Sequence, residues 1–174
     1  NTGIKTAKYL AFYNQKDAIL YLDSVKKYPQ VIKADGLAAG KGVIIAENYN
    51  QAVCAVKDIF SGKFGNMSKL IIEEKVNFIK ELSLIGVRDK KGVTAFYPLV
   101  ENKHINGILH TSIAPYDDDK LQKKAQTYHN ILTDKMNYVG VLVIEFFLDT
   151  ANNLIANEMA PRVHNSGHWT IEGA

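Results

Sequence analysis

Two acidic residues lie inside stretches that are otherwise typical of β-strands. Glu145 sits in the middle of the apolar run 139–149, and Glu158 lies in the next strand-like run, 154–159. If a tight turn centred on residues 151–152 joins two antiparallel strands, the two glutamates lie directly opposite each other. Directly opposed like charges destabilise a sheet, and burying either carboxylate without a partner is strongly unfavourable. The spacing therefore predicts a conflict between the two charges that the protein must relieve.

A divalent cation bound between the two carboxylates would remove this conflict. Asn157, next to Glu158, adds a further oxygen ligand. All-oxygen ligand sets suit Mg²⁺ or Mn²⁺ bridging to phosphate better than they suit Zn²⁺. The alternative is that one glutamate stays protonated and the pair shares a proton. We predict that Glu145, Glu158 and Asn157 hold Mg²⁺ or Mn²⁺.

The segment after the second glutamate is rich in groups that bind anions. Pro161 is followed by Arg162, whose planar guanidinium fits a carboxylate or a phosphate. His164 and Asn165 add short donors and acceptors. A lone histidine is more often structural, but this cluster adjoins the predicted acid pair. We therefore predict an anion pocket beside the metal, formed by Arg162, His164 and Asn165.

A glycine-rich loop between two strand-like runs is a second candidate site. It contains Lys33, Gly36, Gly40, Lys41 and Gly42. Glycines let backbone amides turn toward an anion without steric cost, and two lysines can neutralise a polyphosphate. The loop is not a Walker loop, because Gly42 stands where Ser or Thr should bind magnesium. It also precedes a strand rather than the helix of the dinucleotide fingerprint. Two interpretations stay open: a phosphate site, or a flexible hairpin loop with two solvated lysines.

A third candidate is the strand-like run 69–74, which ends in Glu73 and Glu74 and is followed by Glu81. The end of such a strand can offer backbone donors and acceptors to an adenine edge, while a nearby carboxylate accepts ribose hydroxyls. The alternative is a strand end with solvated charges, and the residues alone favour that alternative.

The elements that must position these residues indicate an α+β chain with a largely antiparallel sheet and two lobes. The turn at 89–92 is a plausible hairpin. Asn48 is a good N-cap for the second helix. The expected helices are 15–28, 48–60 and 121–136, and the expected strands are 30–33, 43–46, 69–74, 81–88, 93–101, 107–114, 139–149 and 154–159.

Composition narrows the class of protein. The 174 residues are 47% apolar and carry a net charge of +3, with acids among the scattered basic residues, so we expect no nucleic-acid partner. The sequence has no apolar run long enough to span a bilayer, and the lone Cys54 fits a reducing compartment. Because the sequence opens with Asn1 and stops at Ala174, just after a turn-like stretch, we expect a piece of a longer protein.

The lysine-and-glycine loop, the acidic strand end and the acid pair followed by Arg162 together resemble the ATP-grasp superfamily. This resemblance implies two α+β lobes that clamp ATP, with residues 1–76 as the small lobe and 77–174 as the large lobe. It also implies an ATP-dependent ligase that uses Mg²⁺ ions. Such ligases form an acyl phosphate, which a nucleophile, usually an amine, attacks.

The finer resemblance is composite. From about residue 70 onward the chain looks like 5-(carboxyamino)imidazole ribonucleotide synthases of purine biosynthesis, whereas residues 1–68, through the motif at 31–43, look like phosphoribosylamine-glycine ligases. The synthases normally carry Tyr-Asp, a pair that helps to hold their substrates, where Ala38 and Ala39 stand here. The acceptor substrate therefore stays open. The runs that carry the synthase resemblance are 95–102, 107–109, 112–115 and 157–173.

The synthase resemblance implies carboxylation of 5-aminoimidazole ribonucleotide with ATP and bicarbonate through carboxyphosphate. The resemblance to phosphoribosylamine-glycine ligases implies glycine and phosphoribosylamine as substrates instead. A third hypothesis is an isolated or chimeric ATP-binding module without turnover. The full-length enzyme is expected in the cytoplasm, without a membrane partner and with a homodimer as one option. The implied roles are phosphate binding for Lys33 and Lys41, adenosine binding for Glu73, Glu74, Val76 and Glu81, metal binding for Glu145 and Glu158, and contact with carboxyphosphate for Arg162, His164 and Asn165.

Overall fold

The computed structural model describes residues 2–36, 42–105 and 107–173. None of the helices within these ranges has the length and apolar content needed to cross a membrane. The helical elements are α1 (Gln15–Ser24), α2 (Tyr49–Phe60), α3 (Asp119–Lys135), the 3₁₀ turn η1 (Asn165–Gly167) and α4 (Thr170–Gly173). The strands are β1 (Tyr9–Phe12), β2 (Gln30–Ala34), β3 (Val43–Ala46), β4 (Leu70–Glu74), β5 (Lys80–Arg88), β6 (Thr94–Phe96), β7 (Val100–Ile105), β8 (Ile108–Ile113), β9 (Gly140–Leu148) and β10 (Leu154–Ala160).

The chain divides into two compact units, one of residues 7–76 and one of residues 1–6 with 77–174. The expected small lobe, 1–76, differs from the first unit in its first six residues. These residues belong to the second unit because the Lys5 carbonyl accepts a 2.8 Å hydrogen bond from the Ala156 amide and Thr6 forms a parallel bridge with Ala156.

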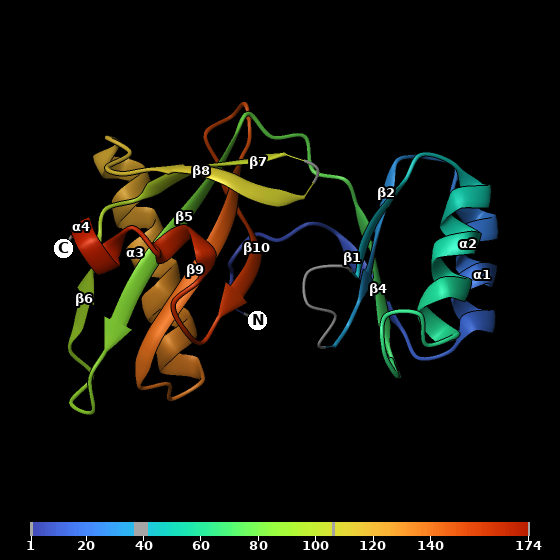
Figure 1. Cartoon of the computed structure of the whole chain (residues 1–174), viewed down its shortest axis with the longest axis horizontal. Helices are drawn as coiled ribbons and strands as arrows, with labels where there is room; N and C mark the ends of the chain where they lie inside the picture. The colour runs from blue at the N-terminus through green and yellow to red at the C-terminus, as the bar shows by residue number, and fades with distance from the viewer. Residues whose placement is uncertain (1, 37–41, 106, 174) are drawn as a thin grey trace. The chain divides into compact units, whose positions relative to one another are not determined.

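In the described part of residues 7–76, four strands form an antiparallel sheet in the order β1-β4-β2-β3. Helices α1 and α2 cover one face of this sheet (Figure 1). The Asn48 side chain accepts a 3.0 Å hydrogen bond from the Gln51 amide, which satisfies a donor at the start of α2. Fully buried Leu22, Ile32 and Ile59 form the core between helices and sheet.

In residues 77–174, leaving aside the undescribed 106 and 174, six strands form an antiparallel sheet in the order β10-β9-β5-β7-β8, with β6 added to β5. Helix α3 lies on one face and packs on Leu84, Ile144 and their neighbours (Figure 1). The 3₁₀ turn η1 lies over the other face, where Gly167 approaches Ile85 so closely that a Cβ would lie 2.9 Å from its Cδ1. The sheet therefore has one apolar face under α3 and a second face on which side chains such as Glu145 project.

Antiparallel sheets with packed helices confirm the α+β prediction, and most expected elements lie within a few residues of their predicted bounds. The expected strand 93–101 is wrong, because it is divided into β6 and β7. Pro98, which has no amide hydrogen, lies between them, and the Leu99 amide donates to the Gln122 side chain at 2.7 Å instead of to a strand. Strand β1 was not predicted, since its short run YLAF has little periodicity.

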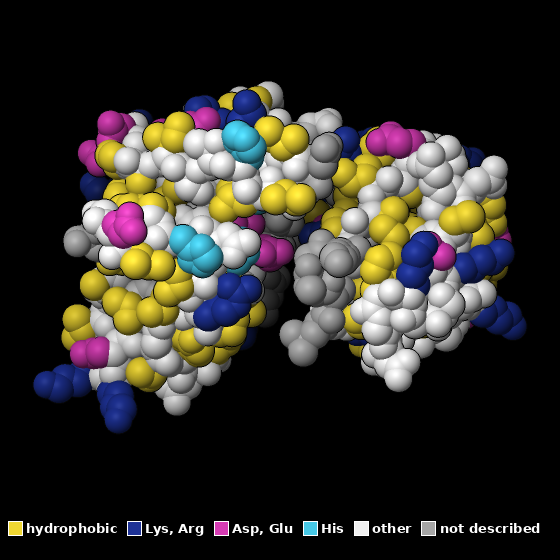
Figure 2. All heavy atoms as spheres, viewed as in Figure 1, with side chains coloured by type: hydrophobic (Ala, Val, Ile, Leu, Met, Phe, Trp, Pro, Cys, Tyr) yellow, Lys and Arg dark blue, Asp and Glu magenta, His cyan; other side chains and the backbone are white. Residues whose placement is uncertain are grey.

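Basic side chains do not gather into a single stripe on the face of the molecule drawn in Figure 2, where acidic side chains lie among them. The chain has 21 Lys and Arg residues against 18 Asp and Glu residues. This distribution agrees with the weak net charge of +3.

Candidate metal and nucleotide site

The acid pair lies on adjacent strands. In the register of β9 and β10, Glu145 pairs directly with Glu158. Paired residues of antiparallel strands project from the same face of a sheet, so the two carboxylates share one side. On the other flank, Glu145 pairs with Ser83 of β5, whose side chain is fully buried. Glu145 therefore lies at the centre of the sheet face that η1 covers.

The pairing arises differently from the way the sequence suggested. The turn is not centred on residues 151–152; it is a longer loop closed between Asp149 and Asn153, in which Asn152 has a positive φ of 57°. The Asp149 carboxylate accepts hydrogen bonds from the Ala151 and Asn153 amides at 2.9 and 2.8 Å. This loop alone would shift the register by one residue. A β-bulge between Ala156 and Glu158 shifts it back, so that Glu158 again faces Glu145.

The His164 imidazole lies between the two acids. The sequence predicted His164 in an anion pocket but did not predict its contact with the glutamates. Its Nδ1 lies 2.9 Å from Oε1 of Glu145, and its Nε2 lies 3.2 Å from Oε1 of Glu158. The contacts with Glu145 and then Glu158 raise the pKa of His164 to about 9, against the opposing effect of burial. The imidazole is therefore cationic at neutral pH and compensates for the acid pair. The feature of the sequence that could have indicated this contact is the position of His164, just beyond the turn at Pro161 and six residues after Glu158.

The same three residues offer ligand atoms to a metal. One atom each from Glu145, Glu158 and His164 lies within 4.8 Å of the others. Oε1 of Glu145 is buried, and the imidazole that touches it is not aligned for a hydrogen bond, so within the described residues this oxygen has no hydrogen-bond partner. In the part of the chain that the structure describes, the close neighbour of this buried oxygen is thus the His164 imidazole of the ion pair, and a bound cation could take the place of that imidazole. The residues therefore fit a hard divalent ion such as Mg²⁺ or Mn²⁺.

The other predicted anion-binding residues lie around this cluster. Arg162 is exposed, and its Nη1 donates a 2.8 Å hydrogen bond to the carbonyl of Val163. Asn165 is exposed at the start of η1. Asn157 lies at the β-bulge, between Ala156 and Glu158. Asn157, Arg162 and Asn165 thus lie in the same short segment as His164, whose imidazole contacts both acids.

In the first unit, the predicted phosphate loop and acidic strand end belong to one sheet. Lys33 on β2 forms a 2.8 Å ion pair with Glu73 on β4, and both side chains are largely buried. The Gly42 carbonyl accepts a 2.8 Å hydrogen bond from Ala34, which joins the two ends of the loop. Gly36 lies against the Met67 side chain, which fills the space where a Cβ would stand. Gly40 and Lys41 lie outside the described residues.

The predicted adenosine-binding residues have different surroundings. Glu74 ends β4 with an exposed side chain, and its amide donates a 3.0 Å hydrogen bond to Lys8. Val76 is half-buried in the segment after β4. Glu81 lies on β5 and forms a 2.8 Å contact with His104 of β7, a residue that the sequence reasoning did not single out.

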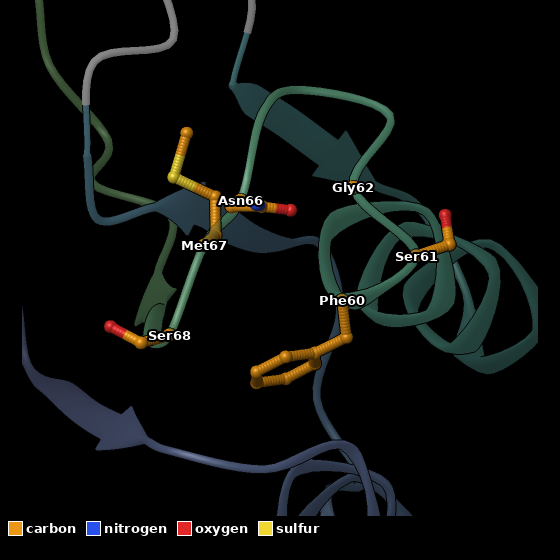
Figure 3. Close-up of a pocket in the computed structure, with 6 residues that line it drawn as sticks. All are labelled: Phe60, Ser61, Gly62, Asn66, Met67 and Ser68. Atoms are coloured by element: carbon orange, nitrogen blue, oxygen red, sulfur yellow. The ribbon is translucent and has the colours of Figure 1, made fainter.

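A pocket of about 300 Å³ lies elsewhere, in the first unit after α2 (Figure 3). Figure 3 shows Phe60 and Ser61 at the end of α2 and Met67 on the returning segment. The lining of this pocket contains no titratable side chain and none of the predicted site residues, so the pocket offers no acid, base or metal ligand. The lining residues are Phe60, Ser61, Gly62, Asn66, Met67 and Ser68.

Known proteins resemble this chain over its whole length. The N5-carboxyaminoimidazole ribonucleotide synthase of Vibrio parahaemolyticus serotype O3:K6 is 39% identical over 176 residues, which cover 100% of this chain and 46% of that protein. A crystal structure of an N5-carboxyaminoimidazole ribonucleotide synthetase in complex with ADP has a TM-score of 0.83 at 34% identity, covering 98% of this chain and 44% of that one. The Aspergillus clavatus synthase, in complex with ADP and 5-aminoimidazole ribonucleotide, has a TM-score of 0.78 at 25% identity, covering 98% and 43%.

The chain therefore spans about half the length of the curated relatives it matches. These matches include residues 1–68, where the sequence alone indicated phosphoribosylamine-glycine ligases, so the likeness to the synthases extends over both parts of the chain. A family model described as the ATP-grasp domain matches residues 1–174. With the expected fold present in both units, the chain belongs to the ATP-grasp domain family.

Proposed function

We propose that this chain is the nucleotide- and metal-binding part of a ligase that carboxylates 5-aminoimidazole ribonucleotide, using ATP and bicarbonate. The observation that carries this function is the pairing of Glu145 with Glu158 in a chain that matches the synthases from end to end. A catalyst of this type must hold metal-bound phosphate at a fixed place, and two facing carboxylates suit that task.

The reaction has two bond-forming steps. A bicarbonate oxygen bonds to the γ-phosphorus of ATP, which gives carboxyphosphate and releases ADP. The amino nitrogen of the ribonucleotide then bonds to the carboxyl carbon, either in carboxyphosphate or in the CO₂ that it releases, and phosphate and a proton leave. Both steps move negative charge onto phosphate oxygens, so positively charged groups held in place favour them.

Residues of the first unit bind the nucleotide. Lys33 and Lys41 neutralise phosphate charge, and Gly36, Gly40 and Gly42 allow the backbone to approach the phosphates. The ion pair between Lys33 and Glu73 supports a role for Glu73 in holding the lysine at the site. Glu74 and Val76 lie at the end of β4, where backbone groups can contact adenine.

Residues of the second unit hold the metal and the reacting anion. Glu145, Glu158 and Asn157 supply oxygen ligands, and Mg²⁺, when bound, neutralises charge on the phosphates and orients them. His164 balances the acids until a cation takes over that role. Arg162, His164 and Asn165 then face carboxyphosphate, where the guanidinium and the imidazole can donate to its oxygens. Glu81 accepts hydroxyls of the ribose.

The test is whether the purified protein releases ADP. We expect ADP to form only when Mg²⁺, bicarbonate and 5-aminoimidazole ribonucleotide are all present, and to stop when a chelator is added. Turnover with glycine and phosphoribosylamine in place of these substrates would show the other ligase activity instead. Magnesium-dependent ATP binding without ADP release under any condition would identify a binding module and would refute the catalytic assignment.

A further inference from the structure

The side chain of Met67 is a feature of the first unit that the proposed reaction leaves unexplained. Its Sδ occupies the space where a Cβ of Gly36 would stand, and its Cε would lie 3.2 Å from that atom. Gly36 is the last described residue before the predicted phosphate loop, and Gly42 is the first described residue after it. Resting on the proposed function, we infer that Met67 is a positioning residue, which holds the first end of this loop in place for the phosphates of the nucleotide.

The contact with Met67 explains why a glycine stands at position 36. Gly62 and Gly65 have positive φ angles of 87° and 103°, a region that favours glycine, whereas the φ of Gly36 lies outside that region. The backbone at position 36 would therefore accept an alanine, but the Cβ of that alanine would overlap Sδ of Met67. Gly36 and Met67 thus form a matched pair, in which the missing side chain of one makes room for the side chain of the other.

The segment after α2 holds Met67 in turn. Cε of Met67 would lie 3.5 Å from a Cβ on Gly65, so the side chain lies between this glycine and the glycine of the loop. The Gly65 amide donates to the Gly62 carbonyl at 3.0 Å, and the Lys63 amide donates to the Asp58 carbonyl of α2 at 3.2 Å. Figure 3 shows the Met67 side chain directed away from the end of α2. The partly buried methionine therefore projects from a segment that is itself bonded to a helix.

Neighbouring residues join the same two segments, but less firmly through their side chains. The Asp35 amide donates to the Lys69 carbonyl at 3.1 Å, and the Lys69 ammonium forms an ion pair with the Asp35 carboxylate. These two side chains are 41% and 31% exposed, and an ion pair this exposed contributes little. At the other end of the loop, the Ala34 amide donates to the Gly42 carbonyl at 2.8 Å. The packing of Met67 is therefore the main side-chain restraint described at the first end.

A thioether suits a restraint beside a site for anions. Its unbranched, uncharged chain can fill a narrow gap, and it neither attracts phosphate nor competes with the lysines of the site. Leucine has a similar volume and would fill much of the same space, whereas alanine would leave it empty. Holding a binding segment in its productive arrangement before the ligand arrives favours binding.

The effect of this restraint should depend on the phosphates of the ligand. If truncation of Met67 leaves the loop correctly held in about one molecule in ten, the apparent dissociation constant of ATP rises about tenfold. Adenosine has no phosphates and makes no use of the loop, so its dissociation constant should change by less than about twofold. A change confined to ATP therefore distinguishes a positioning role from a general loss of structure in the first unit.

The experiment measures the dissociation constants of ATP and adenosine by calorimetry in the presence of Mg²⁺, for wild type, M67A, M67L, G36A, the double variant G36A/M67A and M136A. Met136 is an exposed methionine of the second unit and serves as the matched control. We expect M67A and G36A to weaken ATP binding, M67L to retain most of it, and M136A to change neither constant. The double variant should bind ATP more tightly than G36A, because the smaller residue at 67 makes room for the new methyl group. Circular dichroism and melting temperatures check that each variant folds.

The outcomes separate the positioning role from the proposed function. If folded M67A binds ATP like wild type, or loses ATP and adenosine to the same extent, the positioning role is refuted and the nucleotide site stands. If the losses in M67A and G36A simply multiply in the double variant, the two residues do not act through their contact, and the role is refuted as well. If the wild-type protein does not bind ATP, the proposed function fails and the positioning role fails with it. A loss confined to ATP in M67A, with recovery in M67L and in the double variant, supports the role.

Discussion

Glu158 and Glu145 should respond differently to neutralisation, although they face each other. The Glu158 side chain is 55% exposed and lies 3.2 Å from Nε2 of His164, whereas the Glu145 side chain is 12% exposed and lies 2.9 Å from Nδ1. An exposed ion pair contributes about 0–1 kcal/mol. Removing one partner of a buried pair costs about 3–5 kcal/mol, because the other charge is left without compensation. The two substitutions therefore test the acid pair separately for stability and for metal binding.

Glu158→Gln should lower the free energy of unfolding of the metal-free protein by less than about 1 kcal/mol. His164 keeps its contact with Glu145, and the repulsion between the two carboxylates disappears. Affinity for Mn²⁺ should nevertheless fall about 100-fold or more, equivalent to about 2.7 kcal/mol, since loss of a mere outer-shell partner already costs about 10- to 100-fold. Metal-dependent ADP release should be abolished.

Glu145→Gln should both destabilise the protein, by up to about 3 kcal/mol, and abolish the metal effect. Urea denaturation in a chelator gives the stability, and paramagnetic resonance of free Mn²⁺ gives the affinity. Glu172→Gln, a change of the same charge at an exposed position on α4, is the matched control and should alter neither. Glu158→Gln protein that unfolds far more easily yet binds Mn²⁺ like wild type would refute the assignment.

Three further predictions concern the frame that holds the site. Gly86→Ala should destabilise by about 1–3 kcal/mol, because its Cβ would lie 2.5 Å from Nε2 of His129 and 2.8 Å from Cδ1 of Phe96 in a packed region. Burial lowers the pKa of His129 below 6.5, so the unfolded chain binds a proton first and stability should fall as pH drops below about 6.5, but not in His129→Gln. Asn48→Ala should cost about 1 kcal/mol, because the Gln51 amide loses its acceptor.

Urea denaturation measures all three. For Gly86, unchanged stability would mean that the α3 packing adjusts at no cost. For His129, the difference in stability between wild type and His129→Gln isolates its titration from that of His164, and a difference that stays constant between about pH 6.5 and 5 would contradict the buried neutral imidazole. For Asn48, Asn48→Asp is the control that retains an acceptor, and equal losses in Asn48→Ala and Asn48→Asp would contradict the capping role.

Local patterns predicted the elements well where one periodicity dominated. The continuous apolar run around Glu145 and the cap at Asn48 each depend on residues close in sequence, and both predictions agree with the structure. Prediction failed where the outcome depended on distant partners. The run 93–101 is strand-like in composition, but its two halves pair with different ends of β5, with Pro98 in the gap. Nothing local to residues 93–101 contains that information.

Side-chain partners were harder to predict than elements. The sequence indicated the role of Glu145 and Glu158 because carboxylates within apolar strands are unfavourable when buried without a compensating group. The role of His164 depends on how the connection after Pro161 returns over the sheet, and the contact between His104 and Glu81 depends on the pairing of β5 with β7. The sequence shows which groups are present, whereas the register decides which of them meet.

The β-bulge at Asn157 is the feature on which the acid pair depends. Loop 149–153 sets a register in which Leu154 pairs with Leu148 and Ala156 with Phe146. If that register continued, Asn157 would pair with Glu145, and Glu158 would pair with Ile144 on the face that α3 covers. The two carboxylates would then project from opposite sides of the sheet, and no single ion could contact both. One extra residue in β10 therefore converts an ordinary hairpin into a strand pair that can bind a cation between two acids, with His164 as their counter-charge.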